Sequence, residues 1–168
     1  ERLNGSVKLF FQPNEEVSSG AKDLVREGFM NNPDVDAIIG LHVMPHLDVG
    51  TVELRHGALN ASTTTVDITI HGTSSHAAYP QRGVDAILIA AEVISSLHTL
   101  SSRISAAHLP SVLSLGMING GTKRNIIADT VRLKGTLRTT DDNEKERIKQ
   151  HITTRTKGIA AAHGGSAT

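Results

Sequence analysis

The spacing of hydrophobic residues changes near residue 60. Before this point there are two uninterrupted apolar runs, residues 6–12 and 36–43, and a helical pattern lies between them over about residues 18–28. Apolar strands that do not alternate and are joined by a helix are typical of a parallel sheet covered on both faces. Residues 1–60 are therefore predicted to form part of a mixed, mainly parallel α/β sheet of a catalytic domain.

After residue 60 the pattern alternates. Val66, Ile68 and Ile70 share one face of a predicted strand, and polar side chains occupy the other face, as expected when one side is covered. The elements predicted next are a helix over 84–100, strands over 111–118 and 130–139, and a helix that begins with the capping box of Asp141 and Glu144. This order predicts that residues 61–168 form a ferredoxin-like α+β domain that lacks its last strand, with "HGGSAT" as the turn before it.

Composition narrows the class of partner. Lys plus Arg and Asp plus Glu number 17 each, so no net positive charge attracts nucleic acid or an anionic membrane, and the few aromatic residues cannot stack bases. The absence of cysteine excludes thiolate metal sites, and no apolar run reaches the roughly 20 residues that span a bilayer. We expect a small-molecule or protein partner and a cytoplasmic location. Because the chain begins at Glu1, we also expect it to be an internal piece of a longer protein.

Two adjacent carboxylates follow the first predicted strand. Glu15 and Glu16 come after Pro13, and His42 ends the second predicted strand. Open α/β sheets bind ligands at these strand ends, and two carboxylates with an imidazole suit Zn²⁺ or Mn²⁺. On an extended backbone the two glutamates would point opposite ways, so one could bind metal while the other acts as general base. Solvated loop residues are the alternative, and His46 is a competing ligand.

Three further residues are candidates in the second half. His76 lies in the turn "HGTSSHAAYP", where it is free to hydrogen-bond an outside group, although a solvated loop histidine is the alternative. Asn125 follows a glycine-rich loop and Arg138 ends a strand, and an amide with a guanidinium can clamp a carboxylate. Solvent-exposed surface charge is the alternative for Arg138.

Taken together, the stretches "FQPNEE", "GLHVMP", "GTSSHAAYP", "GVDAI", "GGTKRNIIAD" and "LKGTLRT" occur in the order found in one family. The chain resembles the two-metal amidohydrolases and metallopeptidases that include aminoacylases, hippurate hydrolases, carboxypeptidase G and indoleacetyl-amino-acid hydrolases. The resemblance covers nearly the whole chain and is closest to the hippurate hydrolase and aminoacylase branch. It implies a partial metal-binding catalytic domain over 1–60 and a lid or dimerisation domain over 61–168.

The resemblance also implies roles. Glu15 matches the general base, Glu16 and His42 match metal ligands, and His76 matches a lid histidine that reaches across a homodimer to stabilise the oxyanion. Asn125 and Arg138 match residues that hold the substrate's carboxylate. The implied cofactors are two divalent metal ions, Zn or Mn, and the family's upstream His-x-Cys-Gly-His-Asp segment and a later histidine are not in this sequence. The chain thus holds part of the site only.

The implied reaction is metal-dependent hydrolysis of the amide bond of N-acyl amino acids, by a fragment expected to be inactive alone. Ala128 stands where the family usually has proline, and Asn14 where it often has alanine. A catalytically silent dimerisation module is one alternative, and a peptidase or N-acetyl-diaminopimelate deacetylase of the same family is another. A ferredoxin-like nucleic-acid binder is disfavoured by the zero net charge.

Overall fold

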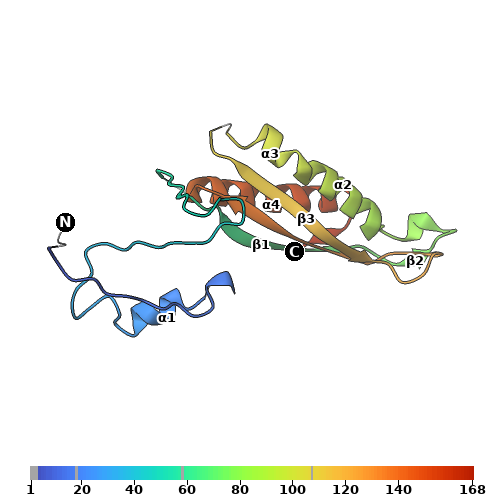
Figure 1. Ribbon diagram of the computed structural model, residues 1–168. Helices are drawn as coiled ribbons and strands as arrows, with labels where there is room; N and C mark the ends of the chain where they lie inside the picture. Colours follow the sequence, from blue (N-terminus) through green and yellow to red (C-terminus); the bar gives the residue numbers. More distant parts are fainter. Residues whose placement is uncertain (1–3, 18, 58, 107) are drawn as a thin grey trace. The chain divides into compact units, whose positions relative to one another are not determined.

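The computed structural model describes residues 4–17, 19–57, 59–106 and 108–168 (Figure 1). The chain forms two compact units, Glu1–Glu53 and Leu54–Thr168, which are described separately. No helix among the described residues is long and apolar enough to cross a membrane.

The first unit contains little regular structure. Its elements are the 3₁₀ turn η1 (Glu15–Val17) and helix α1 (Ala21–Arg26), which forms within the predicted helical segment. The Phe10 and Phe29 rings pack 6.1 Å apart. Ser18, predicted to help open this helix, lies outside the described residues.

The two strands predicted in this unit are not formed. Residues 6–12 and 36–43 form no strand, and apart from the half-buried Phe10 their apolar side chains are exposed, with Leu9 at 74% and Ile39 at 95%. A strand requires a neighbour that accepts and donates backbone hydrogen bonds, and the described part of this unit supplies none to either run. The mixed α/β class is confirmed for the chain, whereas the described residues of the segment 1–60 do not form the predicted parallel sheet.

The second unit is an antiparallel sheet with helices on one face. The sheet has the order β3-β5-β1-β6, and its strands are β1 (Ser62–His71), β3 (Ser111–Gly120), β5 (Thr130–Thr139) and β6 (Ser166–Ala167). Helices α2 (Ala86–His98) and α4 (Asp142–Ala162) contact each other and β5, and the short α3 (Leu100–Arg103) follows α2. This is the predicted ferredoxin-like order.

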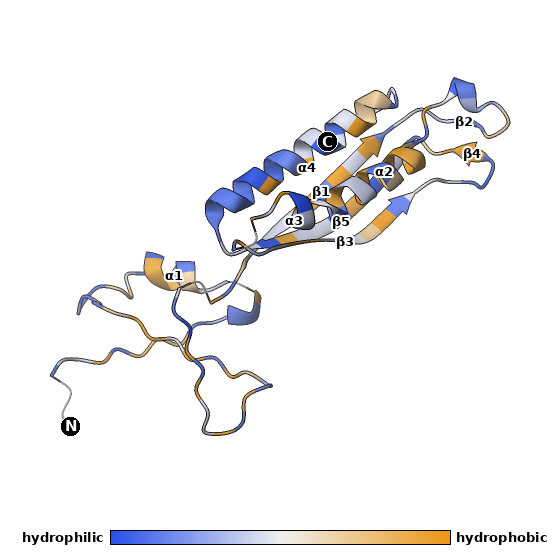
Figure 2. Cartoon of the chain, turned by 90° about the horizontal axis from the view of Figure 1, so that it is seen from above, coloured by the Kyte–Doolittle hydropathy of each residue, from blue (hydrophilic) through white to orange (hydrophobic). Residues whose placement is uncertain are grey.

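The core lies between the helices and the sheet. Val66, Ile68 and Ile70 of β1 are buried and Asp67 is exposed, which confirms the predicted alternation. In Figure 2, α2 is largely hydrophobic, and α4 is mostly hydrophilic with a few hydrophobic positions. Ile148 is one of these and is buried against the sheet.

Only half of the predicted capping box is present. The Asp141 carboxylate accepts a hydrogen bond from the Glu144 backbone N–H at 2.8 Å and so caps α4. The Glu144 side chain is buried and accepts from Arg147 Nε at 2.8 Å. A buried carboxylate is stabilised more by a guanidinium than by one backbone N–H, which accounts for the difference.

The last strand begins inside the chain. Residues predicted as a turn form β6, in which Ala167 pairs with Ile70, and Thr168 exchanges two backbone hydrogen bonds with Thr69 at 2.8 and 2.9 Å. Where β6 no longer pairs with β1, a hollow of about 210 Å³ lies between residues 64–68 of β1 and α4. Thr156 lines this hollow, and its buried hydroxyl has no hydrogen-bond partner among the described residues.

Candidate functional site

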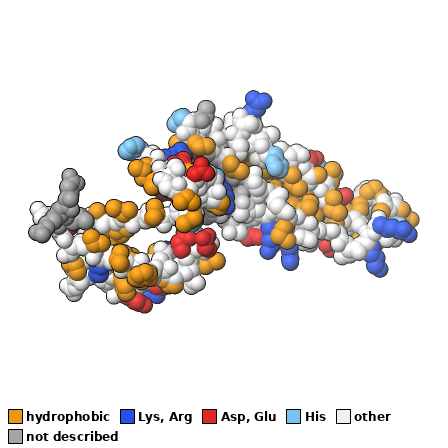
Figure 3. All heavy atoms as spheres, viewed as in Figure 1, with side chains coloured by type: hydrophobic (Ala, Val, Ile, Leu, Met, Phe, Trp, Pro, Cys, Tyr) orange, Lys and Arg blue, Asp and Glu red, His pale blue; other side chains and the backbone are white. Residues whose placement is uncertain are grey.

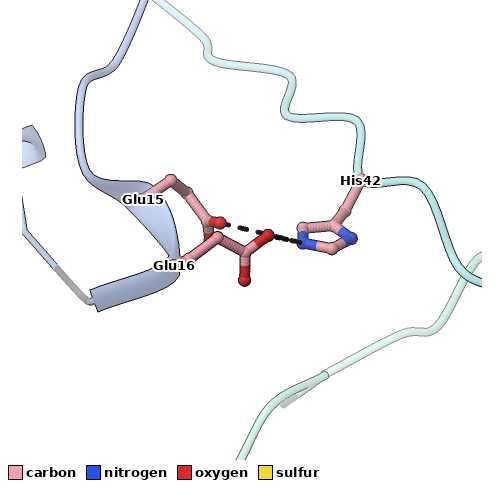
Figure 4. Close-up of side chains that lie close together, drawn as sticks. All are labelled: Glu15, Glu16 and His42. Carbon is pink, nitrogen blue, oxygen red and sulfur yellow. Dashed lines mark ion pairs between the residues drawn. The ribbon is translucent and has the colours of Figure 1, made fainter.

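Glu15, Glu16 and His42 converge in the first unit (Figure 4). His42 Nε2 lies 3.7 Å from Glu15 Oε2 and 3.7 Å from Glu16 Oε1. One ligand atom from each residue lies within 4.8 Å of the others. The adjacent glutamates and a histidine 26 positions later therefore form a cluster of two carboxylates and an imidazole, which is a donor set suited to Zn²⁺ or Mn²⁺.

The hydrogen bonding of His42 fits a ligand role. Its Nδ1 lies 2.8 Å from the Val43 carbonyl oxygen, which can only accept, so Nδ1 carries the proton. In the neutral ring, Nε2 then presents its lone pair to Glu15 and Glu16. Metal-binding histidines commonly donate their second nitrogen to a carbonyl in this way, which fixes the tautomer.

The sequence predicted that the two glutamates point in opposite directions, but in the structure they do not. They lie in the 3₁₀ turn η1, and both carboxylates approach the same histidine nitrogen. Successive side chains on such a turn differ by about 120° rather than 180°, because it has about three residues per turn. The Glu16 side chain is 86% exposed and that of Glu15 is 54% exposed. The like charges of the pair favour a bound cation.

His76 and Asn125 are held together in the second unit. Strand β2 (Ser75–His76) pairs with β4 (Ile126–Ile127), and the Ala77 N–H donates to the Asn125 carbonyl oxygen at 3.0 Å. His76 was predicted to lie in a flexible turn. It lies instead at the end of a short ladder, because the two glycine-containing loops pair with each other. Both side chains are exposed.

The turn after His76 is tightly built. The 3₁₀ turn η2 (Pro80–Arg82) follows it, and Gly83 packs so closely that a Cβ there would lie 2.7 Å from the Thr73 carbonyl oxygen. The Tyr79 ring lies 6.1 Å from the His76 ring and 5.1 Å from the Arg82 guanidinium carbon. Tyr79 and Arg82 were not predicted from the sequence as site residues. Their spacing of three residues across a Pro-containing turn was the available signal.

Basic side chains gather near this turn. Figure 3 shows Lys and Arg at the end of the second unit where β2 lies. Arg82, Lys123 and Arg124 belong to the exposed segments beside β2 and β4. This end of the unit therefore carries positive charge together with the imidazole and the amide.

Arg138 lies at the other end of the sheet. It pairs with Thr63 and Val112 near the end of β5, whereas β4 and Asn125 precede the start of β5 at Thr130. Eight residues of strand separate Thr130 from Arg138, or about 26 Å at 3.3 Å per residue. The predicted clamp of Asn125 and Arg138 on one carboxylate is therefore not formed within a single chain.

Comparisons with protein families, with curated proteins and with solved structures all indicate the same family. Residues 60–163 match the model of the peptidase dimerisation domain. The chain is 39% identical over 162 residues to N-acetyl-L-cysteine deacetylase of Bacillus subtilis, covering 96% of this chain and 38% of that protein. It is 41% identical over 156 residues to N-acetyldiaminopimelate deacetylase of Leuconostoc mesenteroides, covering 92% and 41%. The chain thus spans about two fifths of the length of these relatives.

Solved structures resemble this fold. A dinuclear metal binding peptidase of the M20 family from Bacillus subtilis superposes with a TM-score of 0.74 at 32% identity, covering 94% of this chain and 38% of that one. A protein described as a putative aminohydrolase from methicillin-resistant Staphylococcus aureus gives a TM-score of 0.83 at 27% identity, covering 89% and 40%.

Proposed function

Because the chain belongs to the M20 peptidase family, whose dimerisation domain matches residues 60–163, we propose that it is part of a metal-dependent amidohydrolase of N-acyl amino acids. The observation that carries the proposal is the cluster of Glu15, Glu16 and His42. One carboxylate and the imidazole suffice for the two metal ligands expected in this part of the site, so the cluster contains one further carboxylate. That surplus carboxylate is available to move a proton.

The substrate class follows from the relatives and from the charged groups. The relatives that the chain matches include deacetylases named for N-acetyl-L-cysteine and N-acetyldiaminopimelate, which are both N-acyl amino acids. Such substrates carry a carboxylate, and Arg138 and Asn125 offer a guanidinium and an amide that can bind it. We assign this chain to the N-acyl amino acid class, and the deacetylase names favour a short acyl group.

The residues divide the work. Glu16 and His42 hold a divalent metal ion, Zn or Mn, as part of a two-metal site. A bound ion of this kind polarises the amide carbonyl and makes water more acidic. Glu15 accepts the proton of the attacking water and returns it to the departing amine, while His76 donates a hydrogen bond to the oxygen that gains negative charge. The products are a carboxylic acid and a free amino acid.

Within one chain Arg138 is distant from His76 and Asn125, and a homodimer can bring Arg138 of one chain close to His76 and Asn125 of the other. Strand β3 is an edge strand of the sheet, and its residues Met117 and Ile118 are each 56% exposed. Ile87 on the adjoining α2 is 48% exposed. An edge strand with exposed apolar residues is suited to pair with a second copy. In the proposed dimer, each active site receives His76 and Asn125 from one chain and Arg138 from the other.

The test compares the two adjacent glutamates in the full-length protein. Glu15→Gln is expected to lower hydrolysis of N-acetyl amino acids by about 10²- to 10⁴-fold while metal binding persists, because a general base is lost. Glu16→Gln is expected to weaken metal binding as well. Glu53→Gln is the control, because Glu53 pairs with His46 outside the cluster. Hydrolysis at the parental rate by Glu15→Gln would refute the base assignment.

A catalytically silent assembly module is the second candidate for the 168-residue chain by itself. The match of residues 60–163 to a dimerisation domain favours it. This chain would dimerise without hydrolysing N-acetyl amino acids. Hydrolysis by the isolated chain that is abolished in Glu15→Gln would exclude the silent module.

A further inference from the structure

We propose that the backbone N–H of Ala78 is a positioning group that fixes His76 as its Nε2–H tautomer. The purpose of that tautomer, to donate from Nε2 to a substrate oxygen, rests on the proposed function. The tautomer itself follows from local geometry. The Ala78 N–H donates to His76 Nδ1 at 3.1 Å, and a backbone N–H can only donate. Nδ1 is therefore the acceptor, and the proton of the neutral ring is on Nε2.

The backbone around His76 holds this contact in place. The His76 carbonyl oxygen accepts from the Tyr79 N–H at 2.8 Å, which closes the turn that carries Ala78. On the other side, the Ala77 N–H is bonded to the Asn125 carbonyl oxygen. Three consecutive N–H groups, from residues 77 to 79, are thus directed to three different acceptors. The Ala78 N–H cannot turn away from the ring without breaking the hydrogen bonds on both sides.

The two tautomers differ in what they offer to a substrate. With the proton on Nε2, the exposed ring nitrogen donates to a developing oxyanion. With the proton on Nδ1, the same nitrogen presents a lone pair, which repels negative oxygen. A single oxyanion donor is typically worth about 10²- to 10³-fold in rate. A backbone N–H that selects the donor form acts through His76 without touching the substrate.

The test removes one backbone N–H at a time. Replacing Ala78 with lactic acid changes the N–H to an ester oxygen and keeps the methyl side chain. The matched control is the same replacement at Ala77, whose N–H bonds to Asn125 and not to the ring. Nitrogen-15 NMR of His76 in the 168-residue chain, recorded where the ring is neutral, distinguishes the protonated nitrogen from the unprotonated one.

The unmodified chain is expected to show predominantly Nε2–H. The ratio of Nε2–H to Nδ1–H should fall about fivefold in the Ala78 ester, the effect of one ordinary hydrogen bond, and should fall by less in the Ala77 ester, which loses only a flanking backbone hydrogen bond. Predominant Nδ1–H in the unmodified chain overturns the proposal, as does an equal fall in both esters or no fall in the Ala78 ester. The unmodified chain alone decides the tautomer if an ester does not fold.

Failure of the proposed function is separable from failure of this inference. Parental hydrolysis by His76→Ala in the full-length protein would remove the oxyanion role and leave the tautomer measured by NMR intact. An Nδ1–H tautomer would overturn the inference whatever the activity of that variant.

Discussion

The Nδ1 atom of His42 donates a hydrogen bond to the carbonyl oxygen of Val43 at 2.8 Å. This contact leaves Nε2 unprotonated in the neutral ring, 3.7 Å from the nearest oxygen of each neighbouring glutamate. In this neutral form, the Nε2 lone pair and the two carboxylates are three electron-pair donors that face one another. A divalent cation between them would be attracted by all three groups.

Metal binding is the first prediction from this arrangement. His42→Gln should weaken Zn²⁺ binding, measured by calorimetry on the 168-residue chain, by at least about tenfold, because one ligand is lost from a partial site. His46→Gln is the matched control. His46 pairs with Glu53 at 3.4 Å and lies outside the cluster, so its loss should leave the affinity unchanged. Equal affinity of the His42→Gln variant and the parent would count against the site.

Dimerisation through the β3 edge is the second prediction. Ile118→Lys should shift the chain from dimer to monomer in sedimentation velocity, because a charge replaces an apolar side chain at the proposed contact. Thr63→Lys places the same charge at an exposed position of β1, which is not the β3 edge, and should leave the dimer intact. A dimer that survives Ile118→Lys, or that Thr63→Lys breaks equally, would place the contact elsewhere.

Subunit complementation tests the division of the active site. Asn125→Ala and Arg138→Ala variants of the full-length protein should each lose most activity. Mixed and allowed to exchange subunits, they should recover about a quarter of the parental activity, because about half the dimers are mixed and each has one intact site of two.

The control for this experiment pairs residues from the same end of the sheet. His76→Ala mixed with Asn125→Ala should recover nothing, because every site in the mixed dimer lacks one of the two side chains. No recovery in the first mixture would mean that Asn125 and Arg138 of one chain do not serve different sites. Recovery in the control would mean that His76 and Asn125 of one chain do not serve the same site.

The sequence predicted the second unit well, because each of its strands and helices shows its own pattern of buried and exposed positions. The alternation of Val66, Ile68 and Ile70 can be satisfied only by a sheet with one covered face, and the helix α4 packs its buried Ile148 over that face. Strand β5 forms over the predicted residues 130–139 for the same reason. These segments carry their own burial pattern, so pattern and structure agree.

The sequence predicted the first unit and the relations between distant residues less well. The run at residues 36–43 is apolar enough for a buried strand, but a ladder partner cannot be read from the run itself. The common direction of Glu15 and Glu16 depends on a single 3₁₀ turn, which has no hydrophobic period to reveal it. The separation of Asn125 from Arg138 follows from the length of β5, which the sequence did predict, so the expected clamp within one chain was inconsistent with the predicted strand over 130–139.

Thr156 provides the last prediction, which concerns stability. Its hydroxyl is buried beside the hollow between β1 and α4 and finds no partner in the part of the chain that the structure describes. A buried hydroxyl without a hydrogen bond destabilises the folded state, and valine has nearly the same shape without that group. Thr156→Val should therefore raise the free energy of unfolding, measured by urea denaturation of the 168-residue chain, by about 1 kcal/mol. Thr154→Val changes an exposed position of the same helix and should alter it by less than about 0.5 kcal/mol. A loss of stability in Thr156→Val alone would show that the hydroxyl is hydrogen-bonded in solution.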